Sequence, residues 1–264
     1  MSERIKKIFE KKTKKLVTFT TGGDPDLNTS FEILNTIIKN NIDIIEIGMP
    51  FSDPMADGPS IQESSVRSIK SGTTIKDIFE IVNQVRELNN DIPVILMGYY
   101  NTVFNYGIDN FTSKCSEVGV DGLIIVDLQP EEDTELYNKT KEKKINLIRL
   151  ITPTTDENRL KTILDNASGF LYYVTITGIT GQNSANVENL RSSIKFVKSL
   201  SKLPVIAGFG IKDRTDVENI SDFTDGVVVG SSIVNIIKNN LLDKSIMLNK
   251  IDSFTKELKK GIKQ

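Results

Sequence analysis

Apolar positions along the chain follow two alternating patterns. One is a short run of β-branched and aliphatic residues closed by Gly, Pro or Asp, which is typical of a buried parallel strand. The other places apolar residues three and four positions apart, as at Phe31, Leu34 and Ile38, which is typical of an amphipathic helix. The first pattern predicts strands at residues 16–21, 43–48, 93–98, 122–127, 145–151, 170–176, 204–207 and 226–229. The second predicts helices at residues 5–12, 30–40, 60–71, 75–88, 108–117, 155–166, 190–200, 215–221, 233–239 and 243–260. Residues 129–132 (QPEE) also predict an acidic helix start with Pro near its first position.

This alternation of strands and helices runs along nearly the whole chain, without a linker or a break in composition. It favours a single (β/α)8 barrel domain over residues 1–264. A doubly wound sheet is the alternative, but it more often has a phosphate loop after its first strand. Here Gly22-Gly23 is followed by Asp24-Pro25 and by no Lys, which fits neither glycine fingerprint.

Two carboxylates occur in and after the second predicted strand. Glu46 lies inside the apolar run, and Asp57 lies in a following segment that Pro50, Pro54 and Pro59 keep from being helical. Burial of an unpaired carboxylate is unfavourable by roughly several kcal/mol. Glu46 is therefore either a functional group or one half of a buried pair that only fixes packing.

The composition narrows the chemistry. The chain has no histidine and a single cysteine, Cys115, which excludes Ser-His-Asp and Cys-His nucleophilic sites, metal centres based on these ligands, and an internal disulfide. Proton transfer must then use carboxylates, Lys, Tyr or hydroxyls. A net charge of −2 and the lack of a long apolar stretch indicate neither a nucleic-acid nor a membrane partner. We expect the protein in the cytoplasm, or in the plastid stroma if an organelle encodes it.

Glycines gather after the last strands. The loops after the seventh and eighth strands contain Gly208, Gly210 and the segment Gly230-Ser231. These are the loops that frequently bind phosphate in barrels, through backbone N–H groups and a helix N-terminus. The alternative is that these glycines only form turns. In the sixth strand, Tyr172 and Tyr173 are adjacent, so one points into the barrel and the other outward.

Several of these segments together resemble the tryptophan synthase alpha chain family. The longest match is EIGMPFSDPMADGP from Glu46 to Pro59. Shorter matches cover residues 19–25 (FTTGGDP), 99–101, 119–127 (GVDGLIIVD) and 178–181 (GITG), and also Gly208-Phe209-Gly210 and Gly230-Ser231. The resemblance implies a TIM barrel with an extra N-terminal helix.

The resemblance also implies an activity, the reversible retro-aldol cleavage of indole-3-glycerol phosphate to indole and glyceraldehyde 3-phosphate. Glu46 matches the family's catalytic glutamate, and Asp57 matches the aspartate that stabilises positive charge on the indole nitrogen. We expect Glu46, in an apolar strand, to have a raised pKa, and Asp57, on a polar loop, to stay ionised.

The other site residues also come from the resemblance. Phe19 and Tyr172 match residues beside the indole and the glutamate, and Thr180 matches the threonine of the mobile loop. The residues that match the phosphate site are Gly181, Gly210, Gly230 and Ser231. No metal or cofactor is implied for this chain, since pyridoxal phosphate belongs to a partner beta subunit in an α2β2 complex. The segment after the second predicted strand, residues 49–59, which we call the acidic loop, and Tyr100-Asn101 match the region near that partner.

The chain departs from the family pattern at two places. Ile176-Thr177 replaces a pair that begins with Arg in some members, and Gln129 replaces a usual proline. Other interpretations are a different phosphate-binding barrel enzyme, such as an indoleglycerol-phosphate synthase or a phosphoribosyl isomerase, a stand-alone indole-producing lyase, and a non-catalytic activator of the beta subunit. An indoleglycerol-phosphate synthase would need a catalytic Lys at a strand end, and the predicted strand ends offer none.

Overall fold

The computed structural model describes residues 1–174, 184–208 and 210–262, with only the backbone described at 184–186. Its strands are β1 (Lys15–Thr21), β2 (Ile44–Gly48), β3 (Val94–Gly98), β4 (Gly122–Ile125), β5 (Asn146–Leu147), β6 (Arg149–Ile151), β7 (Leu171–Val174), β8 (Val205–Gly208) and β9 (Gly226–Val229). Its helices are α1 (Glu3–Glu10), α2 (Leu27–Lys39), α3 (Pro59–Lys70), α4 (Ile75–Leu88), α5 (Tyr100–Tyr106), α6 (Ile108–Val118), α7 (Thr134–Glu142), α8 (Glu157–Asp165), α9 (Ser184–Leu200), α10 (Arg214–Ser221), α11 (Ser231–Lys238) and α12 (Lys244–Lys260), and a 3₁₀ helix, η1, covers Pro130–Glu132.

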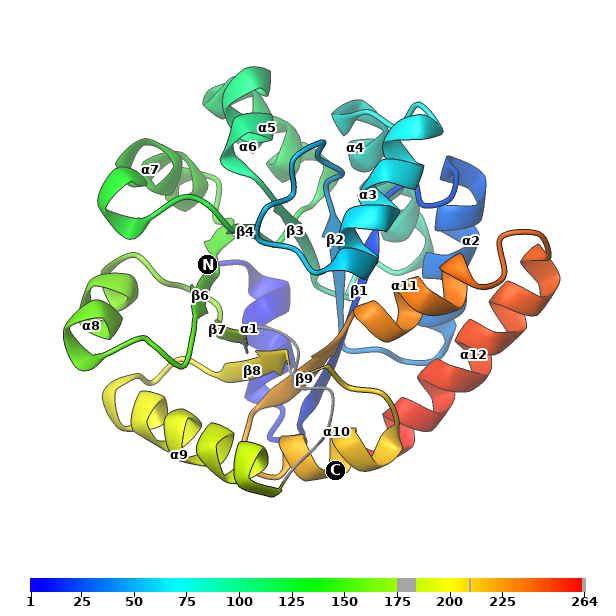
Figure 1. Cartoon of the computed structure of the whole chain (residues 1–264). Coiled ribbons are helices and arrows are strands. Elements are labelled where there is room, and N and C mark those ends of the chain that lie inside the picture. The colour runs from blue at the N-terminus through cyan, green and yellow to red at the C-terminus, as the bar shows by residue number, and fades with distance from the viewer. Residues whose placement is uncertain (175–183, 209, 263–264) are drawn as a thin grey trace.

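The strands form one parallel sheet that closes on itself. Their order is β5-β4-β3-β2-β1-β9-β8-β7-β6, and the helices surround the sheet in Figure 1. The order begins and ends in one stretch of chain, because β5 pairs with β4 and β6 pairs with β7 on either side of Ile148. The backbone N–H of Ile148 donates to Leu123 at 2.9 Å. The predicted strand at 145–151 is therefore one barrel position in two short pieces, and the barrel prediction is confirmed.

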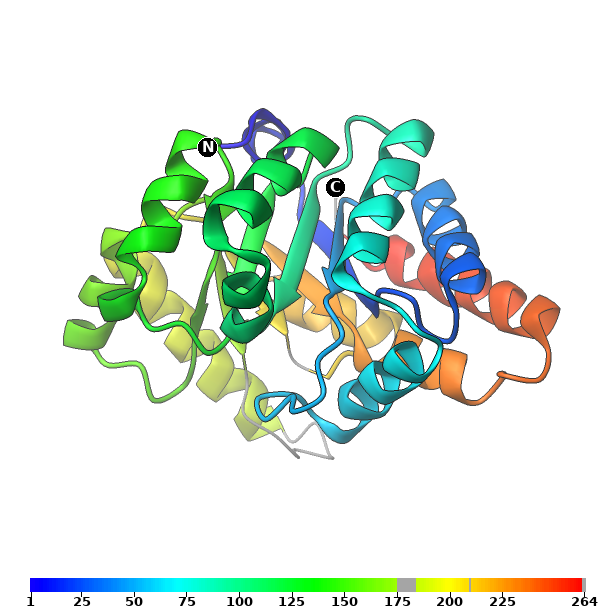
Figure 2. The same ribbon diagram turned by 90° about the horizontal axis from the view of Figure 1, so that it is seen from above.

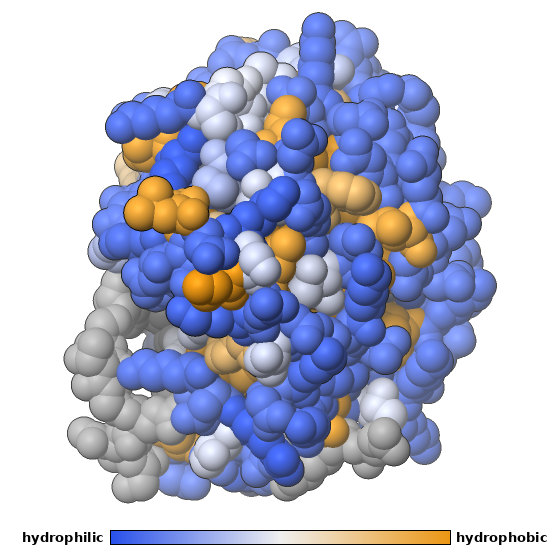
Figure 3. Space-filling model, turned by 90° about the vertical axis from the view of Figure 1, so that its right-hand side faces the viewer, coloured by the Kyte–Doolittle hydropathy of each residue, from blue (hydrophilic) through white to orange (hydrophobic). Residues whose placement is uncertain are grey.

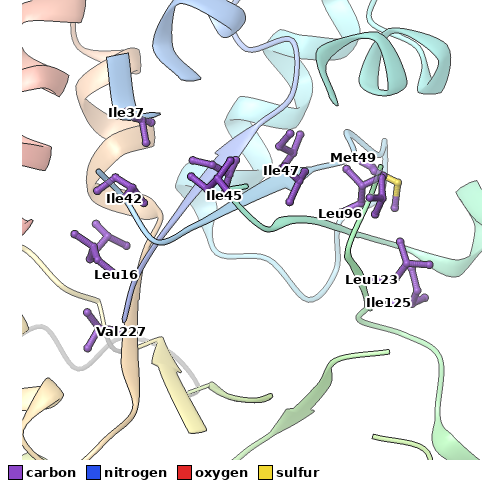
Figure 4. Packing of buried hydrophobic residues seen from close by; sticks show 14 of the residues in the cluster. Leu16, Ile37, Ile42, Ile45, Ile47, Met49, Leu96, Leu123, Ile125 and Val227 are labelled. Carbon is purple, nitrogen blue, oxygen red and sulfur yellow. The ribbon is translucent and has the colours of Figure 1, made fainter. Parts of the chain in front are cut away.

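Strand alternation separates two hydrophobic cores. One fills the barrel and includes Val17, Ile44, Ile95 and Ile206. The other lies between the strands and the outer helices, where Figure 4 shows Leu16, Ile45 and Leu96 of the strands on the same side as Ile37 of α2. Because successive strand residues point to opposite faces, an apolar run with no polar alternation is what two such cores require.

Helix α1 closes the amino end of the barrel. Ile5 is buried in the inner core, and the ring of Phe9 lies 5.8 Å from that of Phe170, just before β7. In Figure 2, α1 (dark blue) lies at one end of the barrel and the light-blue loop after β2 at the opposite end. The predicted extra N-terminal helix is thus a plug under the strands, and it leaves the carboxyl end open for loops.

Some helices differ from the predicted ones. Helix α2 begins at Leu27 rather than at residue 30, because the Asp26 side chain accepts a hydrogen bond from the Thr29 N–H at 2.9 Å and caps it. Helix α9 begins at Ser184 rather than at residue 190. Helix α5 is absent from the predicted set. The helix start predicted at residues 129–132 is confirmed as the 3₁₀ helix η1, but the continuation as α7 was not predicted. Helix α7 buries only Leu136 and Thr140, so its sequence has almost no apolar periodicity.

The face of the molecule that carries α2, α11 and α12 is mainly polar. Figure 3, which faces the side where α2, α11 and α12 lie, shows apolar residues as separate islands on a hydrophilic surface. In the part of the chain that the structure describes, no helix combines the length and apolar character needed to cross a membrane.

Candidate active site

Three predicted site residues point into the barrel from strands β1, β2 and β7. Phe19 of β1 is in register with Glu46 of β2, and Tyr172 of β7 packs against the same inner core. Phe19 is 7% exposed and Glu46 is 1% exposed. The structure therefore brings Phe19, Glu46 and Tyr172 to one end of the barrel, as predicted.

Glycines at strand ends give these rings their room. A Cβ at Gly48 would lie 2.6 Å from the Phe19 ring, and a Cβ at Gly208 would lie 3.0 Å from the Tyr172 ring. A contact under 3 Å requires something to move, and a Cβ at Gly230 would also lie 3.3 Å from Phe19. Gly48 is thus needed for the close approach of the Phe19 ring, whereas at Gly208 the Tyr172 ring would have to shift by only a few tenths of an ångström.

Glu46 is a buried carboxyl group without compensation. Among the described residues, its Oε1 has no hydrogen-bond partner and no cation pairs with it. Burial, and to a smaller extent the nearby charge of Asp57, raise the pKa of Glu46 to about 8. The expected raised pKa is confirmed. The alternative, that Glu46 is half of a buried pair, finds no support in the described residues.

Asp57 lies in the loop between β2 and α3 and faces Glu46. The loop is less open than the sequence indicates. Asp57 is half-buried, and burial raises the pKa of its carboxyl group, while a hydrogen bond from the Tyr99 hydroxyl lowers it. The Tyr99 Oη–Asp57 Oδ2 distance is 3.1 Å. The polar surroundings expected for Asp57 are therefore only partly present. The Tyr99 hydroxyl is the group that favours the ionised form of the Asp57 carboxyl group.

The two tyrosines of β7 separate as strand alternation predicts. Tyr172 packs with the inner core and Tyr173 with the outer one. Burial and the charges of Glu46 and Asp57 raise the pKa of the Tyr172 phenol well above its ordinary value. Tyr172 is therefore a neutral phenol that can donate a hydrogen bond next to the two carboxyl groups.

The glycine-rich loops after β8 and β9 lie against each other. The Ser232 hydroxyl donates to the Ile211 carbonyl at 2.6 Å, which joins the start of α11 to the loop after β8. Gly230 is the N-cap of α11, and Ser231 begins the helix. Gly210 has φ +59° and no neighbouring atom where a Cβ would be, so it faces open space. Thr180, Gly181 and the segment Ile176-Thr177 lie outside the described residues.

Sequence reasoning missed Tyr99. It is 3% exposed, and with Phe19, Thr21, Asp57, Met97 and Val126 it lines a pocket at the mouth of the barrel. The signal was present, because Ile95 and Met97 of β3 point inward and the same period of two continues to Tyr99. Asp127, at the end of the predicted fourth strand, does not line this pocket. Its Oδ1 accepts a hydrogen bond from the Tyr100 N–H at 2.7 Å and caps α5.

Comparison with known proteins identifies the family. The sequence model described as the tryptophan synthase alpha chain matches residues 5–263. The chain belongs to the tryptophan synthase alpha chain family. A tryptophan synthase alpha chain from Petrotoga mobilis is 45% identical, covering 97% of this chain and 98% of its own length. Another from Zymomonas mobilis is 42% identical, covering 98% of this chain and 96% of its own length.

Solved structures agree with that family. Tryptophan synthase subunit alpha from Legionella pneumophila is 33% identical, with a TM-score of 0.91 over 99% of this chain and 98% of that one. An aminoacrylate-bound form of tryptophan synthase from M. tuberculosis is 27% identical, with a TM-score of 0.87 over 99% of this chain and 100% of that one. The resemblance to the tryptophan synthase alpha family and the barrel that it implied are both confirmed.

Proposed function

We propose that Glu46 and Asp57 perform the reaction of a tryptophan synthase alpha chain, the cleavage of indole-3-glycerol phosphate to indole and glyceraldehyde 3-phosphate. The family assignment supplies the lyase activity. The observation that supports these two residues is a buried, unpaired Glu46 with a half-buried Asp57 facing it at the mouth of the barrel. The absence of histidine leaves proton transfer to such groups.

Glu46 first acts as an acid. With a pKa of about 8 its carboxyl group is protonated at neutral pH, so it can protonate the indole carbon that carries the glycerol side chain. Positive charge then develops on the ring nitrogen. Asp57 faces that nitrogen, stabilises the charge and shares its proton. In this step Glu46 donates a proton, whereas Asp57 stabilises positive charge.

Glu46 next acts as a base. As a carboxylate it takes the proton of the adjacent side-chain hydroxyl, and the carbon–carbon bond breaks. The bonding electrons return to the ring and restore neutral indole, while the hydroxyl carbon becomes the aldehyde of glyceraldehyde 3-phosphate. Glu46 ends protonated, as it began. In this scheme the rings of Phe19 and Tyr172, for which the glycines at the strand ends leave space, bound the indole, a flat apolar group.

The phosphate group belongs in the loops after β8 and β9. We assign it to the backbone N–H groups at Gly210, Gly230 and Ser231, at the positive end of the α11 dipole. On the family resemblance alone, we also assign Gly181 to the phosphate site and Thr180 to substrate binding; both lie outside the described residues. No metal or cofactor is assigned to this chain.

A beta subunit is the proposed partner, in an α2β2 complex that takes up the indole and holds pyridoxal phosphate. Two apolar side chains support a protein contact near the mouth of the barrel. Met55 of the acidic loop is 84% exposed, and Phe104 of α5 is 63% exposed. Large exposed apolar residues beside an active site are typical of interfaces. We place this complex in the cytoplasm.

The test is indole release from indole-3-glycerol phosphate, measured with and without a beta subunit. We expect slow release by the chain alone and faster release with the partner. Glu46→Gln should reduce the rate about 10²- to 10⁴-fold, and Asp57→Asn about 10²- to 10³-fold. Glu117→Gln, the same change in an exposed residue of α6 paired with Lys114, is the control and should leave the rate unchanged.

The other interpretations make different forecasts. Fast release without any partner identifies a stand-alone lyase. If no indole is released while inorganic phosphate still binds and the beta subunit is still activated, the chain is a non-catalytic activator. A Glu46→Gln protein with wild-type indole release contradicts the assigned role of Glu46.

A further inference from the structure

The hydroxyl group of Tyr99 makes two hydrogen bonds to the acidic loop, and their direction is determined. The Ala56 N–H donates to Tyr99 Oη at 2.9 Å, and Tyr99 Oη lies 3.1 Å from Asp57 Oδ2. A backbone N–H can only donate, so the phenol oxygen is the acceptor toward Ala56. Its single proton is then directed to the carboxylate of Asp57.

The Tyr99 ring is fixed as well as its hydroxyl. It is buried at the end of β3, and it stacks on Phe51 of the same acidic loop with centroids 5.1 Å apart and planes 23° apart. Both ends of this side chain therefore contact the loop that carries Asp57. Gln62 of α3 holds the loop from another side, but through its Nε2 to the Asp57 backbone carbonyl at 2.9 Å and not to the carboxylate.

From this arrangement we infer that Tyr99 is the positioning residue for Asp57: it occupies Oδ2 and leaves Oδ1 for the ring nitrogen of the substrate. Among the described residues, Oδ1 of Asp57 receives no hydrogen bond, whereas Oδ2 receives one. The inference rests on the proposed function, because it assigns Tyr99 a part in the reaction that Asp57 performs. Tyr99 itself does not touch the reacting atoms.

The electrostatics of the site give Tyr99 a second effect. In the described part of the chain, the titratable groups that face Asp57 are Glu46 of β2, Tyr172 of β7 and Tyr99 just after β3, with Asp127, which follows β4, acting on Tyr99. None of them is a cation. The hydrogen bond from Tyr99 thus opposes the burial that raises the pKa of Asp57, and it favours the ionised form.

The experiment compares Tyr99→Phe with Tyr106→Phe, which removes the same oxygen from the last residue of α5. For Tyr99→Phe we expect kcat/KM for indole release to fall about 10- to 100-fold, as for loss of a hydrogen bond to a charged group. The fall should lie mainly in kcat, because Asp57 acts on charge that develops during the reaction. The acid limb of the pH profile should move to higher pH. Tyr106→Phe should change neither.

A direct titration separates this inference from the proposed function. The carboxyl carbon of Asp57, assigned with Asp57→Asn, is followed by ¹³C NMR against pH. We expect its midpoint to move upward in Tyr99→Phe, whether or not the protein releases indole. Gln62→Ala, which loosens the loop without touching the carboxylate, should leave the midpoint in place. An unchanged midpoint and acid limb in a folded Tyr99→Phe protein overturn the inference while the lyase assignment stands.

A second variant covers the case in which Tyr99→Phe does not fold. Incorporation of 3-fluorotyrosine at position 99 keeps the ring and the hydroxyl but makes the phenol a stronger donor. The Asp57 midpoint should then move downward. If it stays at the wild-type value, Tyr99 does not control Asp57.

Discussion

The two ends of the barrel treat buried charge in opposite ways. At the amino end, the Lys15 ammonium donates to the Lys11 carbonyl at 2.9 Å and to Thr13 Oγ1 at 2.8 Å. At the carboxyl end, Oε1 of Glu46 has no partner among the described residues. Both residues are 1% exposed. Burial alone therefore does not distinguish a functional charge from a structural one, whereas the lack of a partner does.

Asp121 shows the same contrast for a carboxylate. It precedes β4 and accepts hydrogen bonds from the Ser2 hydroxyl, from Arg4, from Arg86 at 2.6 Å and from the Val94 N–H at 2.9 Å. Its donors come from α1, α4 and β3. Asp121 thus joins the N-terminal helix to the strands, while Glu46, in the same barrel, is left to change its protonation. This agrees with the general division of (β/α)8 barrels, in which the amino end contributes stability and the carboxyl end carries the active site.

Removal of the Asp121 carboxylate is the strongest test of the structural role of the amino end. Asp121→Asn leaves the Arg86 guanidinium, only 11% exposed, without its counter-charge. Breaking a buried pair from one side lowers the free energy of unfolding by about 3–5 kcal/mol. Urea denaturation measures the change.

Asp109→Asn is the matched control for that change. Asp109 pairs with Lys139, but its side chain is 72% exposed, so the loss should stay below about 1 kcal/mol. The indole release of folded Asp121→Asn protein, per active molecule, should remain close to wild type. Equal losses of stability in the two variants would show that the amino-end cluster is not a special anchor.

Substitution of Glu46 should raise the free energy of unfolding, whereas substitution of Asp121 should lower it. The pKa of Glu46 is about 8 in the folded protein against an ordinary value of 4.5, so between these values the folded state holds a proton that the unfolded state has lost. The free energy of unfolding therefore falls as pH rises through that window. Glu46→Gln removes this dependence and should be more stable than wild type by a few kcal/mol near pH 8, although its indole release should be strongly reduced.

Denaturation of both proteins at several pH values between 5 and 8 tests this. The difference between Glu46→Gln and wild type should grow steadily with pH. A constant difference would mean that Glu46 titrates at the same pH in the folded and unfolded states, and that its burial has been balanced by a partner.

Much of this arrangement follows from local sequence. The apolar runs predicted the barrel positions, and the prolines around Asp57 predicted a loop, because both signals depend on residues close together in the chain. The resemblance to the family supplied the roles of Glu46 and Asp57, and the raised pKa of Glu46 followed from placing a carboxylate in an apolar strand.

What escaped prediction depends on distant residues. Helix α5 is capped by Asp127, which lies 27 residues from the Tyr100 N–H that it accepts. The surroundings of Asp57 depend on Tyr99, 42 residues away. The helix start at residues 129–132 was predicted, but the extent of α7 was not, because it buries too few apolar residues to show a period. Such contacts exist only once the strands are side by side, so no window along the sequence contains them.

The smallest expected effect lies again at the amino end. Lys144, between α7 and β5, has φ +59°, a left-handed conformation in which a Cβ is strained. Lys144→Gly should raise the free energy of unfolding by about 0.5–1 kcal/mol, since glycine adopts this conformation freely. Lys143→Gly, one residue earlier at φ −86°, is the control and should instead lower it slightly. Indole release should not change in either, because both positions lie at the end of the barrel away from Glu46. Reduced release by a more stable Lys144→Gly protein would show that the amino end influences the site, and that the division between the two ends is incomplete.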